Sequence, residues 1–241
     1  MKKIIVVIAL LFLFTPQVNA SISSASSYIL MDGVTGRVLQ SKDMHSKRLI
    51  ASITKIMTAT IAIESGKLDD IVTVDESVLK AYGSGIYIEV GEEIKLKDLV
   101  YGLMLRSGND AAAMIANYVS GSDEEFVNLM NNKAKELGMK NTIFYNPSGL
   151  PTPHGNYSSV YDMALLTRYA MKNDAYREIV GTKKYKVTTN KKTYVWNNKN
   201  KLLRYDYITG GKTGYTEESG RTLVSTADID NMKLIVVTIR D

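Results

Sequence analysis

Residues 51–59 read ASITKIMTA and place Ser52 three positions before Lys55 in an apolar segment. The apolar spacing over residues 53–63 is helical. Side chains three residues apart lie on one face of a helix, so we expect the hydroxyl and the amine to be neighbours. Burial of the lysine removes hydration from its ammonium, lowers its pKa and lets the amine act as a base. The stretch therefore predicts a serine–lysine catalytic pair, because a serine hydroxyl needs such a base to become a nucleophile.

The spacing of Ser52 and Lys55 is a weak signal by itself. The same spacing occurs at Ser77 and Lys80, where acidic neighbours indicate an ordinary solvated helix start. Two further motifs strengthen it, because SGN at residues 107–109 and KTG at residues 212–214 follow in that order. We expect SGN in a loop between two helices and KTG just ahead of a strand. The three ordered motifs resemble the signature of penicillin-recognising serine enzymes.

The composition indicates a globular chain with few metal-binding side chains. Of its 241 residues, 45% are hydrophobic and 23% are charged, which fits one large domain or two small ones. The sequence has no cysteine, which excludes thiolate catalysis and disulfides, and only two histidines, which disfavours a multi-histidine metal site. The formal net charge of +5 comes from scattered lysines and favours a solvated surface over a nucleic-acid patch.

Residues 1–20 read as a secretory signal peptide. Two lysines precede an apolar run over residues 4–14, and residues 18–20 have the usual cleavage spacing. An uncleaved anchor is the alternative, although the run is short for a membrane span. We therefore expect an exported, extracytoplasmic protein, at the cell wall or the outer face of the membrane. Residues 21–241 are then expected to form its catalytic domain.

The order of the apolar patterns predicts an α/β fold. Residues 27–41 alternate around two glycines as a β-hairpin does, and two more strands are predicted at residues 222–227 and 233–239. Between them lie one strand-like stretch at residues 187–196 and five helical patterns, at residues 53–63, 96–104, 111–118, 122–137 and 159–171. We expect the first and last strands to pair in one antiparallel sheet, with the helical block packed beside it.

Longer segments around the motifs carry a family resemblance. They include YILMDGVTGRVLQSKD, GEEIKLKDLVYGLMLRSGNDAA and GGKTGYTEESG. The sequence resembles the low-molecular-mass penicillin-binding proteins, specifically the D-alanyl-D-alanine carboxypeptidases of the type-5 class. The resemblance covers nearly all of residues 21–241. It implies a penicillin-binding-protein/β-lactamase-like transpeptidase fold, in which an antiparallel sheet has helices on its faces and a helical subdomain.

The resemblance implies catalytic roles for residues of the first two motifs. Ser52 matches the nucleophile that forms an acyl-enzyme, and Lys55 matches the base that takes its proton. Ser107 and Asn109 match groups that relay protons and hold the peptide. His154 has no acidic partner nearby in the sequence, so we expect it to be structural rather than catalytic.

The third motif is implied to bind the substrate. Lys212 and Thr213 match groups that hold the terminal carboxylate, with Lys212 keeping the local field positive. Gly214 allows the strand to lie close to the ligand. The implied oxyanion hole consists of the backbone N–H groups of Ser52 and Tyr215.

The implied reaction is hydrolysis of the bond between two D-alanines at the end of a peptidoglycan stem peptide. Ser52 attacks, the last D-alanine leaves, and water hydrolyses the acyl-enzyme; β-lactams acylate the same serine. No metal, organic cofactor or nucleic acid is expected to take part. Two alternatives stay open: a relative that binds wall peptides or β-lactams without turnover, and a DD-endopeptidase that cuts wall cross-links.

Two departures qualify the resemblance. Class A β-lactamases need a glutamate in a Glu-x-x-Leu-Asn stretch, and the nearest match, EEFVN at residues 124–128, lacks the leucine and lies too close to the second motif. A β-lactamase function is therefore disfavoured. The sequence also stops at Asp241, directly after a predicted strand, where the family usually continues. We expect a catalytic domain that is incomplete at its C-terminal end and lacks the usual C-terminal helix, with membrane contact only through the missing elements.

Overall fold

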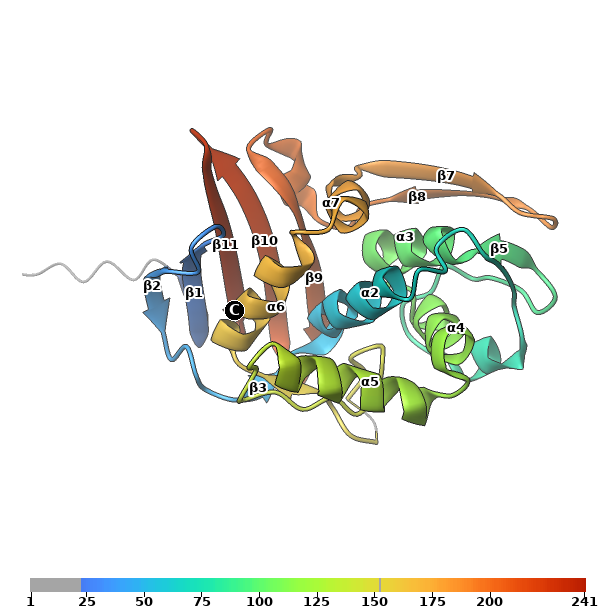
Figure 1. The fold of residues 1–241 in the computed structure, drawn as a ribbon, viewed down its shortest axis with the longest axis horizontal. Helices are drawn as coiled ribbons and strands as arrows, with labels where there is room; N and C mark the ends of the chain where they lie inside the picture. The colour runs from blue at the N-terminus through green and yellow to red at the C-terminus, as the bar shows by residue number, and fades with distance from the viewer. Residues whose placement is uncertain (1–22, 152) are drawn as a thin grey trace, which may run out of the picture.

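The computed structural model describes residues 23–151 and 153–241 and contains a five-stranded sheet beside a block of helices (Figure 1). The predicted signal peptide lies outside the described residues. The strand order is β2-β1-β11-β10-β9, and every neighbouring pair is antiparallel. These strands are β1 (Ser27–Asp32), β2 (Val38–Lys42), β9 (Ile208–Thr216), β10 (Gly220–Ile229) and β11 (Met232–Ile239).

The first and last strands pair as the sequence predicts. Leu30 of β1 lies opposite Val236 of β11, and Met31 lies opposite Ile235. Met31 and Ile235 are buried on the face that packs against α6 (Val160–Ala170), which lies in front of the sheet in Figure 1. Leu30 and Val236 point to the opposite face, because successive side chains of a strand alternate, and both are only half-buried.

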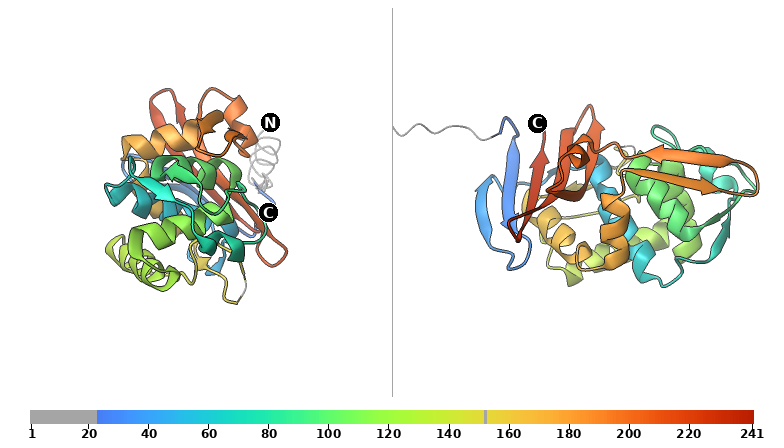
Figure 2. Two further views of the ribbon diagram at one scale, coloured as in Figure 1. Left: turned by 90° about the vertical axis from the view of Figure 1, so that its right-hand side faces the viewer. Right: turned by 90° about the horizontal axis from the view of Figure 1, so that it is seen from above.

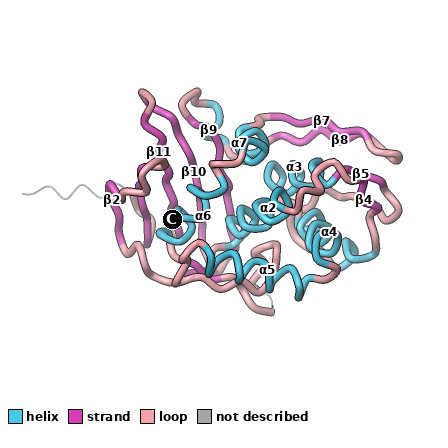
Figure 3. The backbone as a smooth tube through the Cα atoms, in the orientation of Figure 1, coloured by secondary structure: helices cyan, strands magenta, loops and turns pink. Residues whose placement is uncertain are grey.

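The helical block packs at the β9 side of the sheet, as the cyan segments of Figure 3 show. Its central helix, α2 (Lys55–Glu64), is buried on all sides from Lys55 to Ile63. A helix surrounded by other elements needs apolar residues all round, which explains its sequence. Around it lie η1 (Ala51–Thr54), η2 (Glu76–Lys80), α3 (Leu96–Arg106), α4 (Asn109–Ser120) and α5 (Asp123–Glu136).

A long hairpin extends from the sheet side over the helices, as the right-hand view of Figure 2 shows. It consists of β7 (Lys184–Thr188) and β8 (Thr193–Asn197) and follows α7 (Asp174–Gly181). The remaining elements are η3 (Lys201–Arg204) and two small sheets, which pair β3 (Arg48–Leu49) with β6 (Tyr157–Ser158) and β4 (Ile71–Thr73) with β5 (Glu93–Lys95). No helix among residues 23–151 and 153–241 has the length and apolar character needed to cross a bilayer.

The structure differs from the sequence-based expectations at several places, among them the KTG motif and helix α7. The KTG motif at residues 212–214 lies inside β9 rather than ahead of a strand, paired with β10. Glycines at 210, 211 and 214 weaken the strand pattern there, and pairing with β10 supplies what local preference lacks. The short helix α7 was not predicted from the sequence. Its side-chain cap, the Asn173 amide oxygen accepting from the Tyr176 N–H, is the signal that identifies it.

Candidate active site

Ser52 and Lys55 lie together where η1 leads into α2. Ser52 is in η1, Lys55 is the first residue of α2, and Lys55 Nζ lies 3.2 Å from Ser52 Oγ. Ala51, directly before the serine, has φ of 47°, in the left-handed region that costs a non-glycine residue free energy. Strain of this kind concentrates at functional positions, and here it lies directly before Ser52.

The Lys55 amine has three polar contacts, with Asn109, Ser148 and Ser52. Lys55 is fully buried, and its Nζ donates to Asn109 Oδ1 at 2.7 Å and to the Ser148 carbonyl. The orientation of the Asn109 amide is fixed, because its Nδ2 donates to the Tyr82 carbonyl. A neutral amine has two N–H bonds and one lone pair. With both N–H bonds donated to groups that only accept, the lone pair remains to accept the Ser52 O–H.

The surroundings of Lys55 favour this neutral form. Burial is the largest cause and lowers its pKa well below the usual lysine range. The positive charges of Lys212 and Lys199 lower the pKa further, while Asp110 acts in the opposite direction. These surroundings suit a candidate general base better than a solvated charge.

The second and third motifs meet at Lys212. Its Nζ donates to Ser107 Oγ at 3.1 Å and to the Thr213 carbonyl at 2.7 Å. Ser107 ends α3 with φ of 64°, and Asn109 begins α4, so the SGN motif lies at the junction of two helices as predicted. Burial, followed by the charge of Lys199, lowers the pKa of Lys212 to about 7.

Gly214 brings the β9 backbone against Ser52. A Cβ at this position would lie 2.9 Å from the Ser52 backbone nitrogen and 2.4 Å from Thr222 Oγ1, so a larger residue forces the two segments apart. The Thr222 hydroxyl also donates to the Ile50 carbonyl at 3.2 Å, which fixes the sheet to the chain entering η1. Tyr215, the next residue of β9, is 65% exposed beside this contact.

A loop that the sequence reasoning did not single out completes the site. The Ser148 carbonyl accepts from Lys55, and the Pro147 carbonyl accepts from Thr58 Oγ1 at 2.6 Å. Gly149 has φ of 85°, and a Cβ there would lie 2.0 Å from the Ala51 carbonyl oxygen. The run NPSGLP contained the signal, since proline and glycine mark a fixed turn, but its contacts with α2 depend on the fold.

Lys199 and His154 are the two remaining residues whose positions bear on the sequence-based predictions. Lys199, which the sequence reasoning missed, donates from Nζ to Ser84 Oγ at 3.0 Å, and its backbone N–H donates to the Leu105 carbonyl. It is the additional cation that lowers the pKa of both buried lysines. His154 is exposed and packs near the Tyr145 ring, so it contacts the loop rather than the reacting groups.

Comparison with known proteins identifies the family. The sequence model of the peptidase S11 family, D-alanyl-D-alanine carboxypeptidase, matches residues 15–241. The chain belongs to the D-alanyl-D-alanine carboxypeptidase family. It is 40% identical to the carboxypeptidase DacF of Bacillus subtilis over 88% of this chain and 56% of the relative. It is 37% identical to DacC of Escherichia coli over 96% of this chain and 62% of the relative. The chain thus spans about six tenths of these curated relatives.

Solved structures confirm the penicillin-binding-protein fold expected for this carboxypeptidase-family chain. A D-alanyl-D-alanine carboxypeptidase from Mycobacterium tuberculosis has a TM-score of 0.86 and 29% identity, over 89% of this chain and 82% of that chain. A mutant of the Streptomyces K15 DD-transpeptidase has a TM-score of 0.85 and 31% identity, over 90% of each chain. The antiparallel sheet and the adjoining helical subdomain are therefore those of the family.

Two cavities border residues of the candidate site. The larger, of about 1020 Å³, is lined by Asn109 and Ser148, the two acceptors of Lys55. The smaller, of about 550 Å³, is lined by Thr213, Gly214 and Tyr215 of β9. Neither lining includes Ser52 or Lys55, and the second cavity is connected to the serine through Gly214, which packs against the Ser52 backbone.

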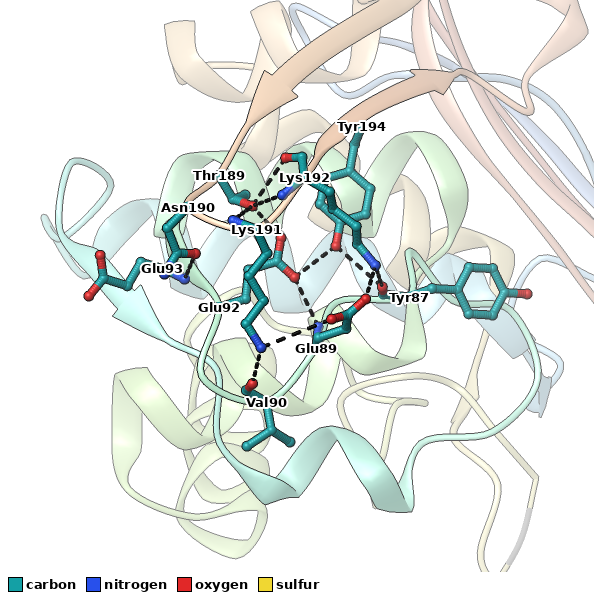
Figure 4. Close-up of polar contacts among 10 residues, drawn as sticks. All are labelled: Tyr87, Glu89, Val90, Glu92, Glu93, Thr189, Asn190, Lys191, Lys192 and Tyr194. Carbon is teal, nitrogen blue, oxygen red and sulfur yellow. Dashed lines mark hydrogen bonds and ion pairs between the residues drawn. The ribbon is translucent and has the colours of Figure 1, made fainter.

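The end of the β7–β8 hairpin contacts the loop before β5, which contains Glu89 and Glu92 (Figure 4). Glu92 is fully buried, and its carboxylate accepts from the hydroxyls of Thr189 and Tyr194 and from the Glu89 N–H. Earlier in the same loop, the Tyr82 carbonyl accepts from Asn109 Nδ2 at 2.6 Å. The hairpin therefore supports, through one loop, the amide that orients Lys55.

Replacing Glu92 by alanine is expected to destabilise this carboxypeptidase-family fold by about 2–4 kcal/mol, because two hydroxyls lose their buried acceptor. The free energy of unfolding in urea measures the effect. Glu93→Ala is the matched control, since the side chain of Glu93 is exposed one position away. A Glu92→Ala variant as stable as the Glu93→Ala variant would show that the Glu92 contacts do not stabilise the fold.

Proposed function

We propose that residues 21–241 form the catalytic domain of an exported serine-type D-alanyl-D-alanine carboxypeptidase. The observation that carries the proposal is the fully buried Lys55 amine, which lies 3.2 Å from Ser52 Oγ and is held by contacts with Asn109 and Ser148. A solvated lysine lacks both the burial and the two fixed acceptors. Family membership supports the same reading.

The proposed reaction begins when Ser52 Oγ attacks the carbonyl of the penultimate D-alanine while Lys55 takes the hydroxyl proton. The backbone N–H groups of Ser52 and Tyr215 stabilise the oxyanion that forms. Collapse breaks the peptide bond as Ser107, bonded to Lys212, passes its proton to the amine of the leaving D-alanine; the proton held by Lys55 replaces it, so Lys55 is neutral again. Water then attacks the acyl ester while Lys55 takes its proton, and that proton passes to Ser52 Oγ as the ester bond breaks.

The proposed substrates are peptidoglycan stem peptides that end in D-Ala-D-Ala. β-Lactams place a strained amide and a carboxylate in one small molecule and are expected to acylate the same serine. The larger cavity, lined by Asn109 and Ser148, has room for a peptide next to the groups that contact Lys55. Such substrates lie outside the cytoplasmic membrane, which agrees with the predicted signal peptide at residues 1–20.

The direct test supplies the purified chain with a wall pentapeptide ending in D-Ala-D-Ala and measures free D-alanine. We expect one D-alanine and one tetrapeptide for each pentapeptide consumed. Covalent labelling by penicillin without any D-alanine release would instead identify a binding relative without turnover. A cross-linked muropeptide, tested in parallel, distinguishes a DD-endopeptidase by release of the two separate peptides.

Acyl transfer to an amine is a second candidate, favoured by the similarity to the Streptomyces K15 DD-transpeptidase over 90% of both chains. The same acyl-enzyme serves both reactions, and they differ only in whether water or an amine attacks it. Adding glycylglycine to the pentapeptide assay separates them. A transpeptidase yields a peptide lengthened by the acceptor, whereas a carboxypeptidase yields the tetrapeptide alone.

A further inference from the structure

A separate cavity of about 230 Å³ opens where the C-terminal parts of α2 and α6 meet the start of α7. Its buried wall consists of Thr60, Ile63, Ala170 and Tyr176, each at most 8% exposed. Thr60 follows Lys55 in α2 by about 7.5 Å along the helix axis, so the cavity is distinct from the reacting groups. Its volume is below the range of about 300–1,000 Å³ that drug-sized ligands need and well above the roughly 30 Å³ of one water, so it suits a small organic molecule.

The Tyr176 hydroxyl has no protein partner. Tyr176 is 2% exposed, and its hydroxyl forms no hydrogen bond in the part of the chain that the structure describes. The partnerless side-chain atoms that are fully enclosed in that part are Arg168 Nε and Ser225 Oγ, so the Tyr176 hydroxyl is not enclosed. It therefore opens into the cavity that its side chain lines. Burial raises the pKa of the hydroxyl above its usual range, so it stays protonated and donates.

The charges around this cavity leave one positive charge without a partner. Glu64 lines the cavity, but its carboxylate is paired with Lys133 at 3.1 Å. Asp174, at the start of α7, is paired with Arg177. Lys172 also lines the cavity, is exposed, and belongs to no ion pair among the described residues. The unbalanced charge favours an anionic ligand.

Asn173 supplies a second donor beside the hydroxyl. Its Oδ1 accepts from the Tyr176 N–H as the cap of α7, which fixes the orientation of the amide. Its Nδ2 has no hydrogen-bond acceptor among the described residues and is left for a ligand. Ile63 and Ala170 add apolar surface beside these donors. A carboxylate group with a short apolar chain matches both parts of the cavity.

We propose that this cavity binds a small organic carboxylate of amino-acid size. The Tyr176 hydroxyl and the Asn173 amide donate to the carboxylate oxygens, and Lys172 balances the charge. The proposal does not depend on the proposed function, because none of these residues takes part in that reaction. Two sources share the ligand chemistry: free D-alanine, the product of the proposed reaction, and a short-chain acid such as propionate.

The test titrates the purified wild-type chain with D-alanine, L-alanine and sodium propionate, and follows the amide NMR chemical shifts. We expect the largest shifts at residues 172–177 and a Kd of about 1 mM. Propionamide lacks the charge and inorganic phosphate lacks the apolar chain, so each is expected to bind at least about tenfold more weakly. Tighter binding of D-alanine than of the other two carboxylates identifies the reaction product as the ligand, and equal binding identifies a general carboxylate site.

Two variants test the groups that bind. Tyr176→Phe removes only the hydroxyl and is expected to weaken carboxylate binding about tenfold, without loss of stability in urea, because the hydroxyl has no protein partner. Lys172→Gln is expected to weaken it by about the same factor, and Lys172 is exposed, so the variant should fold. Tyr207→Phe and Lys135→Gln remove the same groups at exposed positions elsewhere and should bind like the wild type.

A cavity that holds only water would overturn the proposal, and would appear as unchanged shifts at residues 172–177 with every carboxylate up to about 100 mM. Shifts centred on Ser52 would assign the binding to the candidate active site and overturn it as well. Equal affinities of Tyr176→Phe and the wild type, or tighter binding of phosphate than of any carboxylate, contradict the role of the hydroxyl and the ligand class respectively.

Discussion

Ser52→Ala is expected to abolish covalent labelling by penicillin entirely. Intact-mass measurement of the wild-type chain after treatment with benzylpenicillin should show one added molecule of the antibiotic, on the peptide that contains Ser52. The variant should show none, because no other hydroxyl lies beside the Lys55 lone pair among the contacts of the described residues. The substitution removes one oxygen and is not expected to disturb the fold.

The chain contains its own matched control for this result. Ser77 stands three positions before Lys80, with the same spacing as Ser52 and Lys55. Lys80 is exposed, however, and Ser77 Oγ contacts Met114 rather than an amine. Ser77→Ala should therefore label like the wild type. An adduct that persists in Ser52→Ala would assign the nucleophile to another residue and end the proposed mechanism.

Lys55→Met is expected to slow acylation about a thousandfold, the range of one lost general base. Methionine fills the buried site without a charge, so the loss reports the missing lone pair rather than a cavity. Lys55→Arg should be as slow, since a guanidinium is always protonated and cannot accept the serine proton. Stopped-flow measurement of the acylation rate with labelled penicillin provides the readout.

Lys80→Met is the control for the lysine, because Lys80 is exposed and belongs to the second Ser-x-x-Lys pair. Its acylation rate should equal that of the wild type. A Lys55→Arg variant that kept the wild-type rate would refute the neutral-base role, whatever the effect of methionine. Comparing the stability of the variants then separates a catalytic loss from a folding loss.

The sequence predicts the reacting groups better than it predicts what holds them. Ser52, Lys55, Asn109 and Lys212 belong to short motifs whose order is informative. Lys55 contacts Ser52 and Asn109, and Lys212 contacts Ser107 of the same motif as Asn109. The contribution of Ser148 depends on its backbone carbonyl, which any residue type provides. A contact made by a backbone carbonyl cannot be predicted from a side-chain pattern, so it is found only in the structure.

Lys199 illustrates a second limit. A lysine in a run of asparagines and lysines reads as solvated charge, and its side chain is indeed exposed. It acts on the site at a distance, through its charge, and lowers the pKa of both buried lysines. Electrostatic coupling of this kind depends on the packing of β8, α3 and β9 and has no period or spacing in the sequence.

Some strands of the sheet can be predicted from the sequence, and β9 cannot. β1, β10 and β11 contain runs of apolar and β-branched residues that predict strands, and burial alternates along β1 and β11. β9 carries several glycines, whose small size the site requires at Gly214, and so its pattern is weak. The functional requirement of the site therefore conceals the strand that builds it.

The central claim is that Lys55 is uncharged when Ser52 reacts, and the pH dependence of acylation tests it most directly. Lys199→Met should move the acid side of the profile to higher pH, because a positive charge that lowers the pKa of Lys55 is lost. In the wild type, the acylation rate by benzylpenicillin should fall toward acid and reach its plateau well below about pH 10, the range of an ordinary lysine. A rate that instead rises about tenfold per pH unit up to about pH 10 would mean a normally charged Lys55 and would contradict the mechanism.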